Sequence, residues 1–193
     1  MALVHLSATA PTLGLLLNKL CNYELDIYDN IILQYNFFKP ETKKELKEGV
    51  NLWCSNKQEA IKKYGDIGLW DTSKIIDMRQ LFYSKKYFND DISNWNVSNV
   101  TNMNYMFCTA KKFNKPLNDW NVSNVTSMDS MFKNTSSFNQ SLDNWNVSNV
   151  KSMNDMFWGA ISFNQPLNDW DVSNVTYMTD MFNASGMLDY NKP

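Results

Sequence analysis

One heptapeptide occurs in four nearly identical copies at a fixed spacing. Trp95–Thr101 has the sequence W-N-V-S-N-V-T, close copies begin at Trp120, Trp145 and Trp170, and a more divergent copy begins at Trp70. The period is therefore 25 residues, with no insertion. A fixed period of this size is typical of stacked repeat proteins, in which each unit buries its apolar side against the next unit. A residue type that recurs at this period is therefore expected to serve stacking before it serves chemistry.

Two apolar spacings alternate within each repeat. Trp120 and Val122 alternate, which predicts a very short strand. From Val125 to Phe132 the apolar spacing becomes three, three and one, which predicts one face of a short helical turn. The combined pattern resembles the strand-and-turn half of a leucine-rich repeat. The sequence therefore predicts an α/β repeat solenoid, leucine-rich-repeat-like, built of 25-residue coils.

Asparagine and methionine columns follow the same period. We expect the asparagines to bond backbone groups at the turns, because a short amide side chain suits tight turns. We expect the methionines to fill the core rather than to bind a soft metal, since flexible thioethers pack irregular gaps. The columns are Asn99, Asn124, Asn149 and Asn174; Asn89, Asn114, Asn139 and Asn164; Met103, Met128, Met153 and Met178; and Met106, Met131, Met156 and Met181.

The first third of the chain lacks the repeat. A helix is predicted to begin at Pro40 and to bury Trp53, and a second helix is predicted to close at Gly65. A stack of repeats needs its end covered, so residues 1–69 are predicted to form an α-helical N-terminal cap on a solenoid of about five repeats over residues 70–193. The alternative is that residues 1–69 form an independent partner-binding domain.

Composition disfavours several function classes. The net charge is −2 without a basic patch, so we expect no nucleic-acid partner. His5 is the one histidine, which excludes Ser-His-Asp, Cys-His and multi-histidine metal sites within this sequence. The three cysteines Cys21, Cys54 and Cys108 lack metal-ligand spacing. We therefore expect no catalytic residues, no cofactor and no metal.

The N-terminal residues do not resemble a secretion signal. Met1–Leu17 has no basic start, and Pro11 interrupts its apolar stretch. No segment is apolar over the length of a membrane span. These features favour an intracellular or virion location over a secreted one.

The repeat resembles one known family. The unit W-N-V-S-N-V-T-x-M-x-x-M-F-x-x-A-x-x-F-N-Q-P-L-N-D, present with few departures at Trp95–Asp119, strongly resembles the BspA-like repeat, and the resemblance covers about residues 50–188. This relative of leucine-rich repeats has no assigned function and occurs in bacterial surface lipoproteins and in proteins of protists and their large DNA viruses. The resemblance implies a fold and a role in contacts, with no catalytic residue to transfer.

These observations favour a non-enzymatic, structural or protein-binding repeat protein, part of a larger assembly such as a virus particle. A cell-surface adhesin is the alternative, and an enzyme is disfavoured. Partner specificity is expected where aligned positions differ. We therefore predict that Tyr105 and Trp158 mark the partner-binding surface, because Trp158 stands where the other copies have Cys108, Lys133 and Asn183. Packing of Trp158 on the adjacent coil or on the C-terminal tail is the competing interpretation.

Overall fold

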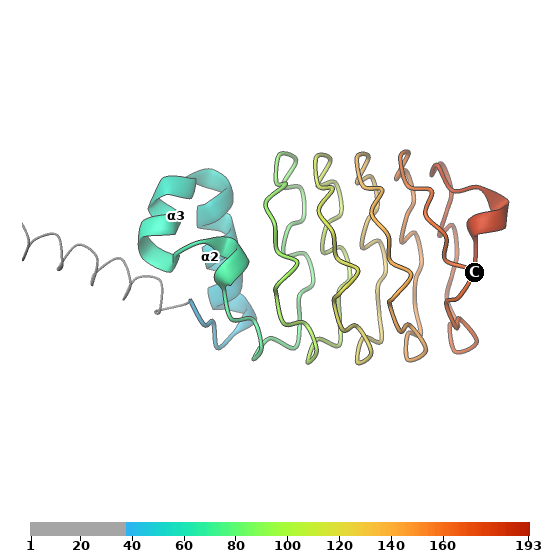
Figure 1. Cartoon of the computed structure of the whole chain (residues 1–193), viewed down its shortest axis with the longest axis horizontal. Coiled ribbons are helices and arrows are strands. Elements are labelled where there is room, and N and C mark those ends of the chain that lie inside the picture. The colour runs from blue at the N-terminus through green and yellow to red at the C-terminus, as the bar shows by residue number, and fades with distance from the viewer. Residues whose placement is uncertain (1–37) are drawn as a thin grey trace, which may run out of the picture. The chain divides into compact units, whose positions relative to one another are not determined.

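The computed structural model describes residues 38–193, which form one compact unit. In chain order its elements are α2 (Lys43–Ser55), α3 (Lys57–Tyr64), the 3₁₀ helix η1 (Ile67–Leu69), a series of coils, and the 3₁₀ helix η2 (Asp189–Asn191) (Figure 1). The predicted cap over residues 1–37, and the argument about a secretion signal, fall outside the described residues.

Both predicted helices that fall in the described residues are present, but the first begins later than predicted. α2 begins at Lys43 rather than at Pro40, because the Thr42 hydroxyl accepts a hydrogen bond from the Glu45 N–H at 3.2 Å and caps the helix. α3 is capped by Asn56, whose side chain accepts from the Glu59 N–H at 3.2 Å. Gly65 ends α3 as predicted, with a φ of 69° in the left-handed region.

After Trp70 the chain winds into successive coils that lie side by side (Figure 1). Neighbouring coils meet along one segment of each repeat, which we call the turn ribbon: residues 76–84, 101–109, 126–134, 151–159 and 176–184. Within it the Met128 N–H donates to the Ser152 carbonyl and the Phe132 N–H to the Met156 carbonyl, both at 2.9 Å. Parallel bridges join residues 77, 102, 127, 152 and 177 in the same way. Backbone hydrogen bonding between coils thus repeats at the period of the sequence.

The helical turn predicted from Val125 to Phe132 is wrong. This segment is a run of tight turns, and Ser130 and Asn134 have φ values of 55° and 57°. Left-handed residues at these intervals break a right-handed helix, and alternate N–H groups point to the next coil instead of to the carbonyl four residues earlier. The strand predicted at Trp120 and Val122 is also absent; the chain turns there, and the parallel pairing lies in the turn ribbon.

The core is a set of aromatic columns that run along the stack. Phe132 lies 5.5 Å from both Phe107 and Phe157, nearly parallel to each, and 4.2 Å from Phe138 in its own coil. The five aligned tryptophans are all buried, as are the aligned methionines except the half-buried Met178 in the last coil. The expectation that these recurring residues pack the core is confirmed.

Four of the five core tryptophans, all but Trp70, also make a polar contact that the sequence analysis missed. The indole N–H reaches back one coil and donates to a backbone carbonyl 28 residues earlier in the chain. The pairs are Trp95 with Ile67 (2.7 Å), Trp120 with Ile92 (3.2 Å), Trp145 with Leu117 (2.9 Å) and Trp170 with Leu142 (3.0 Å). A buried ring with one donor therefore ties consecutive coils together, which an aliphatic residue cannot do.

The two asparagine columns are ladders, as expected, and they have opposite polarity. In one column the side-chain amide donates to a backbone carbonyl of the preceding coil, as Asn124 Nδ2 does to Ser98 O at 2.7 Å. In the other column the side-chain oxygen accepts a backbone N–H of the next coil, as Asn139 Oδ1 does from Asn164 at 3.0 Å. In a third ladder, the side-chain oxygens of Asn104, Asp129 and Asn154 accept backbone N–H groups of the next coil. One of its three members is an aspartate, so this acceptor role does not require an amide.

α2 packs against the first coil. Trp53 meets the Trp70 ring edge-on at 5.9 Å, and Gly49 leaves the room for it, because a Cβ there would stand 3.1 Å from Trp70. Two lysines of α2 bind the turn ribbon: Lys47 Nζ donates to the Leu81 carbonyl at 2.7 Å, and Lys43 Nζ lies 3.0 Å from Asp77. The free edge of the first coil is thereby covered by a helix.

Truncating Phe132 to alanine should lower the free energy of unfolding by about 3–5 kcal/mol, because it empties a fully buried site between two stacked rings. Urea denaturation gives the value. The matched variant Phe182→Ala removes the same ring at the end of the column, where it is half-buried, and should cost less. Equal costs at both positions would contradict the stacked core.

The two asparagine ladders should respond oppositely to aspartate. Asn124→Asp replaces a donor with a carboxylate that faces the Ser98 carbonyl, so we expect a loss of about 1–3 kcal/mol in unfolding free energy. Asn139→Asp keeps the acceptor, as Asp129 does in its own column, and should change stability by less than about 0.5 kcal/mol. Thermal unfolding of the two isosteric variants, side by side, tests the assignment; equal losses would refute it.

Acid should weaken the contact between α2 and the first coil. Burial disfavours the Asp77 carboxylate, but hydrogen bonds from Arg79 and Lys43 outweigh burial and lower its pKa to about 2. A folded-state pKa below the unfolded value stabilises the fold above about pH 4, and this stabilisation is lost as the pH falls through about 2. We expect that loss to be about 1–2 kcal/mol. Asp77→Asn should flatten this part of a stability-against-pH curve, and an unchanged curve would show that the ion pair contributes nothing.

Candidate functional site

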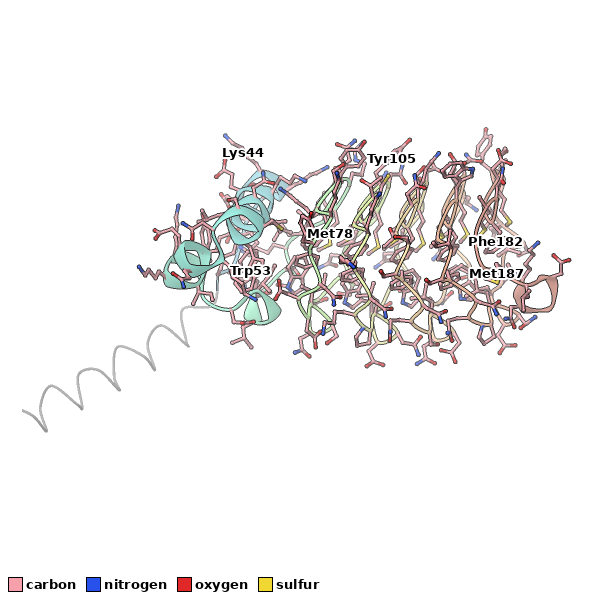
Figure 2. The ribbon with its side chains drawn as sticks, turned by 90° about the horizontal axis from the view of Figure 1, so that it is seen from above. Lys44, Trp53, Met78, Tyr105, Phe182 and Met187 are labelled. Carbon is pink, nitrogen blue, oxygen red and sulfur yellow. The ribbon has the colours of Figure 1, made fainter. Side chains whose placement is uncertain are left out.

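Residues that differ between repeats gather on the outward side of the turn ribbon. The apolar positions that recur in every copy lie inside the stack, as Met78 does, whereas Tyr105 lies at its edge with 40 % of its surface exposed (Figure 2). Tyr105 has a φ of 58°, so its backbone is held in the left-handed region like that of its equivalents in the other coils. The ribbon therefore presents variable side chains from a uniform backbone.

Trp158 takes part in a small cluster on this ribbon. The Lys133 ammonium, from the preceding coil, lies 4.8 Å from the centre of the Trp158 ring and 2.9 Å from a carboxylate oxygen of Asp155. The ring is half-buried and is oriented by the cation above it. Trp158 thus contacts the adjacent coil, as one of the two interpretations expected, and keeps part of its surface open to a partner.

Tyr105 lies apart from this cluster. It comes from the second coil and Trp158 from the fourth, so about 10 Å of stack separates their coils. Tyr105 instead lines a shallow cavity of about 320 Å³ with Lys43, Arg79, Gln80 and Asn104. The structure brings the two predicted residues onto one ribbon but not into one contact.

Two other positions in these columns are not surface residues. Ser130 is 2 % exposed and Cys108 is buried, although their equivalents are exposed or half-buried. Burial raises the pKa of the Cys108 thiol, which therefore stays protonated at neutral pH. The column that contains Trp158 is thus buried at Cys108 in the second coil, and the column that contains Tyr105 is buried at Ser130 in the third coil.

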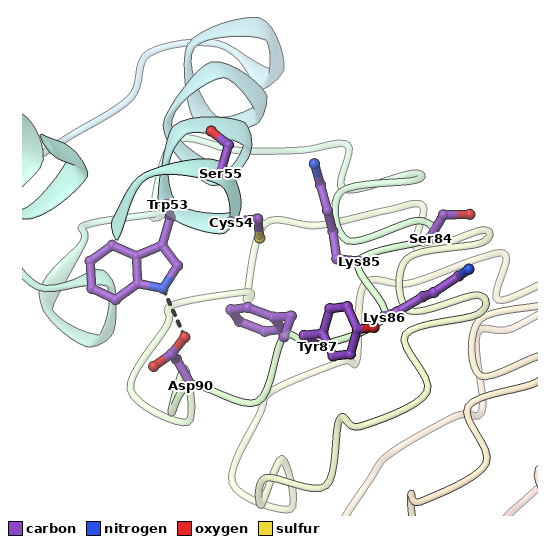
Figure 3. Close-up of a pocket in the computed structure, with 9 residues that line it drawn as sticks. Trp53, Cys54, Ser55, Ser84, Lys85, Lys86, Tyr87 and Asp90 are labelled. Carbon is purple, nitrogen blue, oxygen red and sulfur yellow. Dashed lines mark hydrogen bonds between the residues drawn. The ribbon is translucent and has the colours of Figure 1, made fainter. Parts of the chain in front are cut away.

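A second hollow lies where the end of α2 meets the first coil (Figure 3). It encloses about 330 Å³ and is lined by Trp53, Cys54, Ser55, Ser84, Lys85, Lys86, Tyr87, Phe88 and Asp90. The sequence analysis missed this pocket because its two walls are about 30 residues apart in the chain. The exposed residue Tyr87, which the next three repeats replace with lysine or serine, is the signal that could have indicated it.

Two groups of this pocket that could do chemistry, Asp90 and Cys54, are engaged or unreactive. Asp90 accepts a hydrogen bond from the Trp53 indole at 2.8 Å and forms an ion pair with Lys57 at 2.5 Å. Cys54 is exposed as a residue, but partial desolvation of its thiol raises the pKa, which disfavours the nucleophilic thiolate at neutral pH. Lys47 lies outside the pocket lining; burial and the nearby Lys85 lower its pKa to about 8, and its ammonium donates to the Gln80 and Leu81 carbonyls. The pocket is therefore better suited to contact than to acid–base or nucleophilic chemistry.

Two searches of the described residues add to this picture. Between residues 38 and 193 no three His, Cys, Asp or Glu side chains come together as metal ligands would. Over the same residues, none of the helices has the length and apolar character needed to cross a bilayer.

Comparison with known proteins identifies one family. The family model described as "Mycoplasma protein of unknown function, DUF285" matches residues 52–160 and again residues 119–192, which together include α3 and all the coils. Neither a curated protein nor a solved structure matches the chain.

Proposed function

The chain belongs to the DUF285 family, whose function is unknown, and we propose that it is a non-enzymatic repeat protein that binds other proteins through its turn ribbons. The observation that supports this most is the division of each repeat into two sets of residues. The recurring tryptophans, phenylalanines, methionines and asparagines all serve the stack. Several exposed side chains on the ribbon differ between copies, which suits a surface for selective contacts.

Tyr105 and Trp158 are proposed as the anchors of that surface. Aromatic residues supply large contact area at low conformational cost, and they are enriched among residues that dominate binding energies. Lys133 and Asp155 place a paired charge beside Trp158, which gives the surface a polar rim. The proposed partner is therefore another protein rather than a small molecule.

We further propose that the coils form an α/β solenoid of the BspA-like, leucine-rich-repeat type, capped by α2 and α3, and that the protein works within a larger assembly such as a virus particle. The match to the DUF285 family supports the BspA-like relationship. The continuous core from Leu46 of α2 to Met187 after the last coil supports the cap.

Replacing both Tyr105 and Trp158 with serine should remove the anchors and weaken partner binding by at least about tenfold. The melting temperature should change by less than about 4 °C, because Tyr105 is exposed and the Trp158 ring makes a single cation contact with Lys133. Cross-linking of the tagged chain in its source cells, followed by quantitative mass spectrometry of the captured proteins, measures binding.

The matched control is Leu69→Ser with Ile161→Ser. Both residues are more exposed than Tyr105 but lie off the ribbon columns, so the control should retain the partners. Equal loss in both double variants would show a nonspecific effect of surface apolarity. Retained partners with a large drop in melting temperature in the first variant would show that its residues are structural.

A further inference from the structure

The turn ribbon has a direction. Residues at alternate positions, such as Met103, point their N–H groups to the next coil, and the residues between them, such as Asn102, point their carbonyls to the preceding coil. The N–H of Met103 accordingly meets the carbonyl of Ser127, and the N–H of Met78 meets that of Asn102, both at 3.0 Å. The first ribbon residue is an exception, because the Thr101 N–H donates to the Ile76 carbonyl of the preceding coil. Four bonds run the other way, so the first coil presents mainly acceptors and the last coil mainly donors.

The acceptor end is partly covered by α2. Lys47 donates to the Leu81 carbonyl, which is one of the outward ribbon acceptors of the first coil, and Lys43 pairs with the Asp77 side chain beside it. α2 therefore lies where the last coil of a second copy would have to add to this first ribbon. Two donor ends facing each other would oppose N–H groups to N–H groups, so they cannot pair either.

The donor end is open. The N–H groups of Met178, Asp180, Phe182 and Ala184 make no hydrogen bond within residues 38–193. Their equivalents one coil earlier, at Met153, Asp155, Phe157 and Gly159, all donate to the last coil at 2.8–2.9 Å. Four aligned backbone donors thus stand at the end of the ribbon without acceptors.

The same end exposes apolar side chains. Val172, Val175, Met178 and Phe182 are half-buried, whereas their equivalents in the preceding coil are fully buried. The charge on this ribbon is confined to Asp180, so the edge lacks the lysines and prolines that natural proteins use to block strand addition.

The chain covers the other half of this end itself. The Leu167 N–H donates to the Asn191 carbonyl at 2.9 Å, and the Gly186 N–H donates to the Ala160 carbonyl at 3.2 Å. Asn191 also donates its side-chain amide to Asn164 Oδ1 at 2.9 Å, as Gln165 does to Asn139 within the stack. The C-terminal tail thus makes the hydrogen bonds of a further coil to residues 160–167. It makes none to the outward N–H groups of the ribbon at residues 176–184.

We propose that the ribbon at residues 176–184 is a docking edge for an extended segment of another polypeptide, which runs parallel to it and supplies backbone carbonyls at alternate residues. Apolar side chains of that segment cover Val175, Met178 and Phe182. Strand addition of this kind draws affinity from main-chain hydrogen bonds and specificity from alternate side chains. This surface is distinct from the Tyr105 and Trp158 surface and does not depend on it.

Amide hydrogen exchange of the full chain tests the edge. Without a partner, the N–H groups of Met178, Asp180, Phe182 and Ala184 should exchange at least about tenfold faster than their equivalents at residues 153–159. The probe is a synthetic peptide of residues 145–163, whose carbonyls at 152, 154, 156 and 158 meet such donors inside the stack. At about 1 mM it should slow exchange at those four amides and nowhere on the ribbons of residues 101–134.

Two variants with the same new side chain separate docking from stability. Val175→Lys places a charge on the open end and should abolish protection by the peptide. Thr126→Lys adds the same charge at an exposed position of a middle coil, where the next coil already has Lys151. This variant should leave protection by the peptide unchanged. No protection at about 1 mM peptide, equal protection by a scrambled peptide, or dimers that protect the edge without peptide would each overturn the proposal.

Discussion

The hydrogen bonds between turn ribbons are the constraint on which the rest of the structure depends. In each ribbon, the N–H groups of four alternate residues face the next coil, and the carbonyls of the residues between them face the preceding coil. A coil without this arrangement could not join the stack. That requirement forces left-handed backbone conformations on non-glycine residues such as Tyr105, Ser130 and Asp155. Each costs energy by itself, and the aromatic columns beneath the ribbon compensate for it by burial.

The side chains of the ladders supplement this backbone pairing where the chain turns away from the ribbon. Asn124 supplies a donor, Asn139 supplies an acceptor, and the core tryptophan supplies a donor from within the apolar interior. Aspartate replaces asparagine at Asp129, where an acceptor alone is needed, and in no aligned position where the amide donates. The residue choice at each polar column thus follows from which atom faces the neighbouring coil.

Much of the interior could be predicted from the sequence, because a residue that recurs every 25 positions has to serve contacts between copies. The backbone path could not, since an apolar spacing of three, three and one fits a helical turn and a run of tight turns equally well, and no glycine announces the left-handed conformation of Ser130 or Asp155. The variation between copies is the basis of the prediction that Trp158 and Tyr105 contact a partner, which stays a prediction. The burial of Cys108 and the pocket beside Cys54 depend on residues from other coils or from α2, which no local pattern reveals.

Most of the ribbon hydrogen bonds between neighbouring coils point the same way, which has an electrostatic consequence. Peptide dipoles that point the same way along an axis add, as they do in an α-helix, where they amount to about half an elementary charge at each end. Here the sum runs along the stack rather than along the chain, with partial negative charge at the first coil and partial positive charge at the last. Lys43 and Lys47 lie at the negative end. Every added repeat would lengthen this axis without changing its sign, so a longer array of the same coils would attract anionic groups and carbonyls to its final coil in the same way.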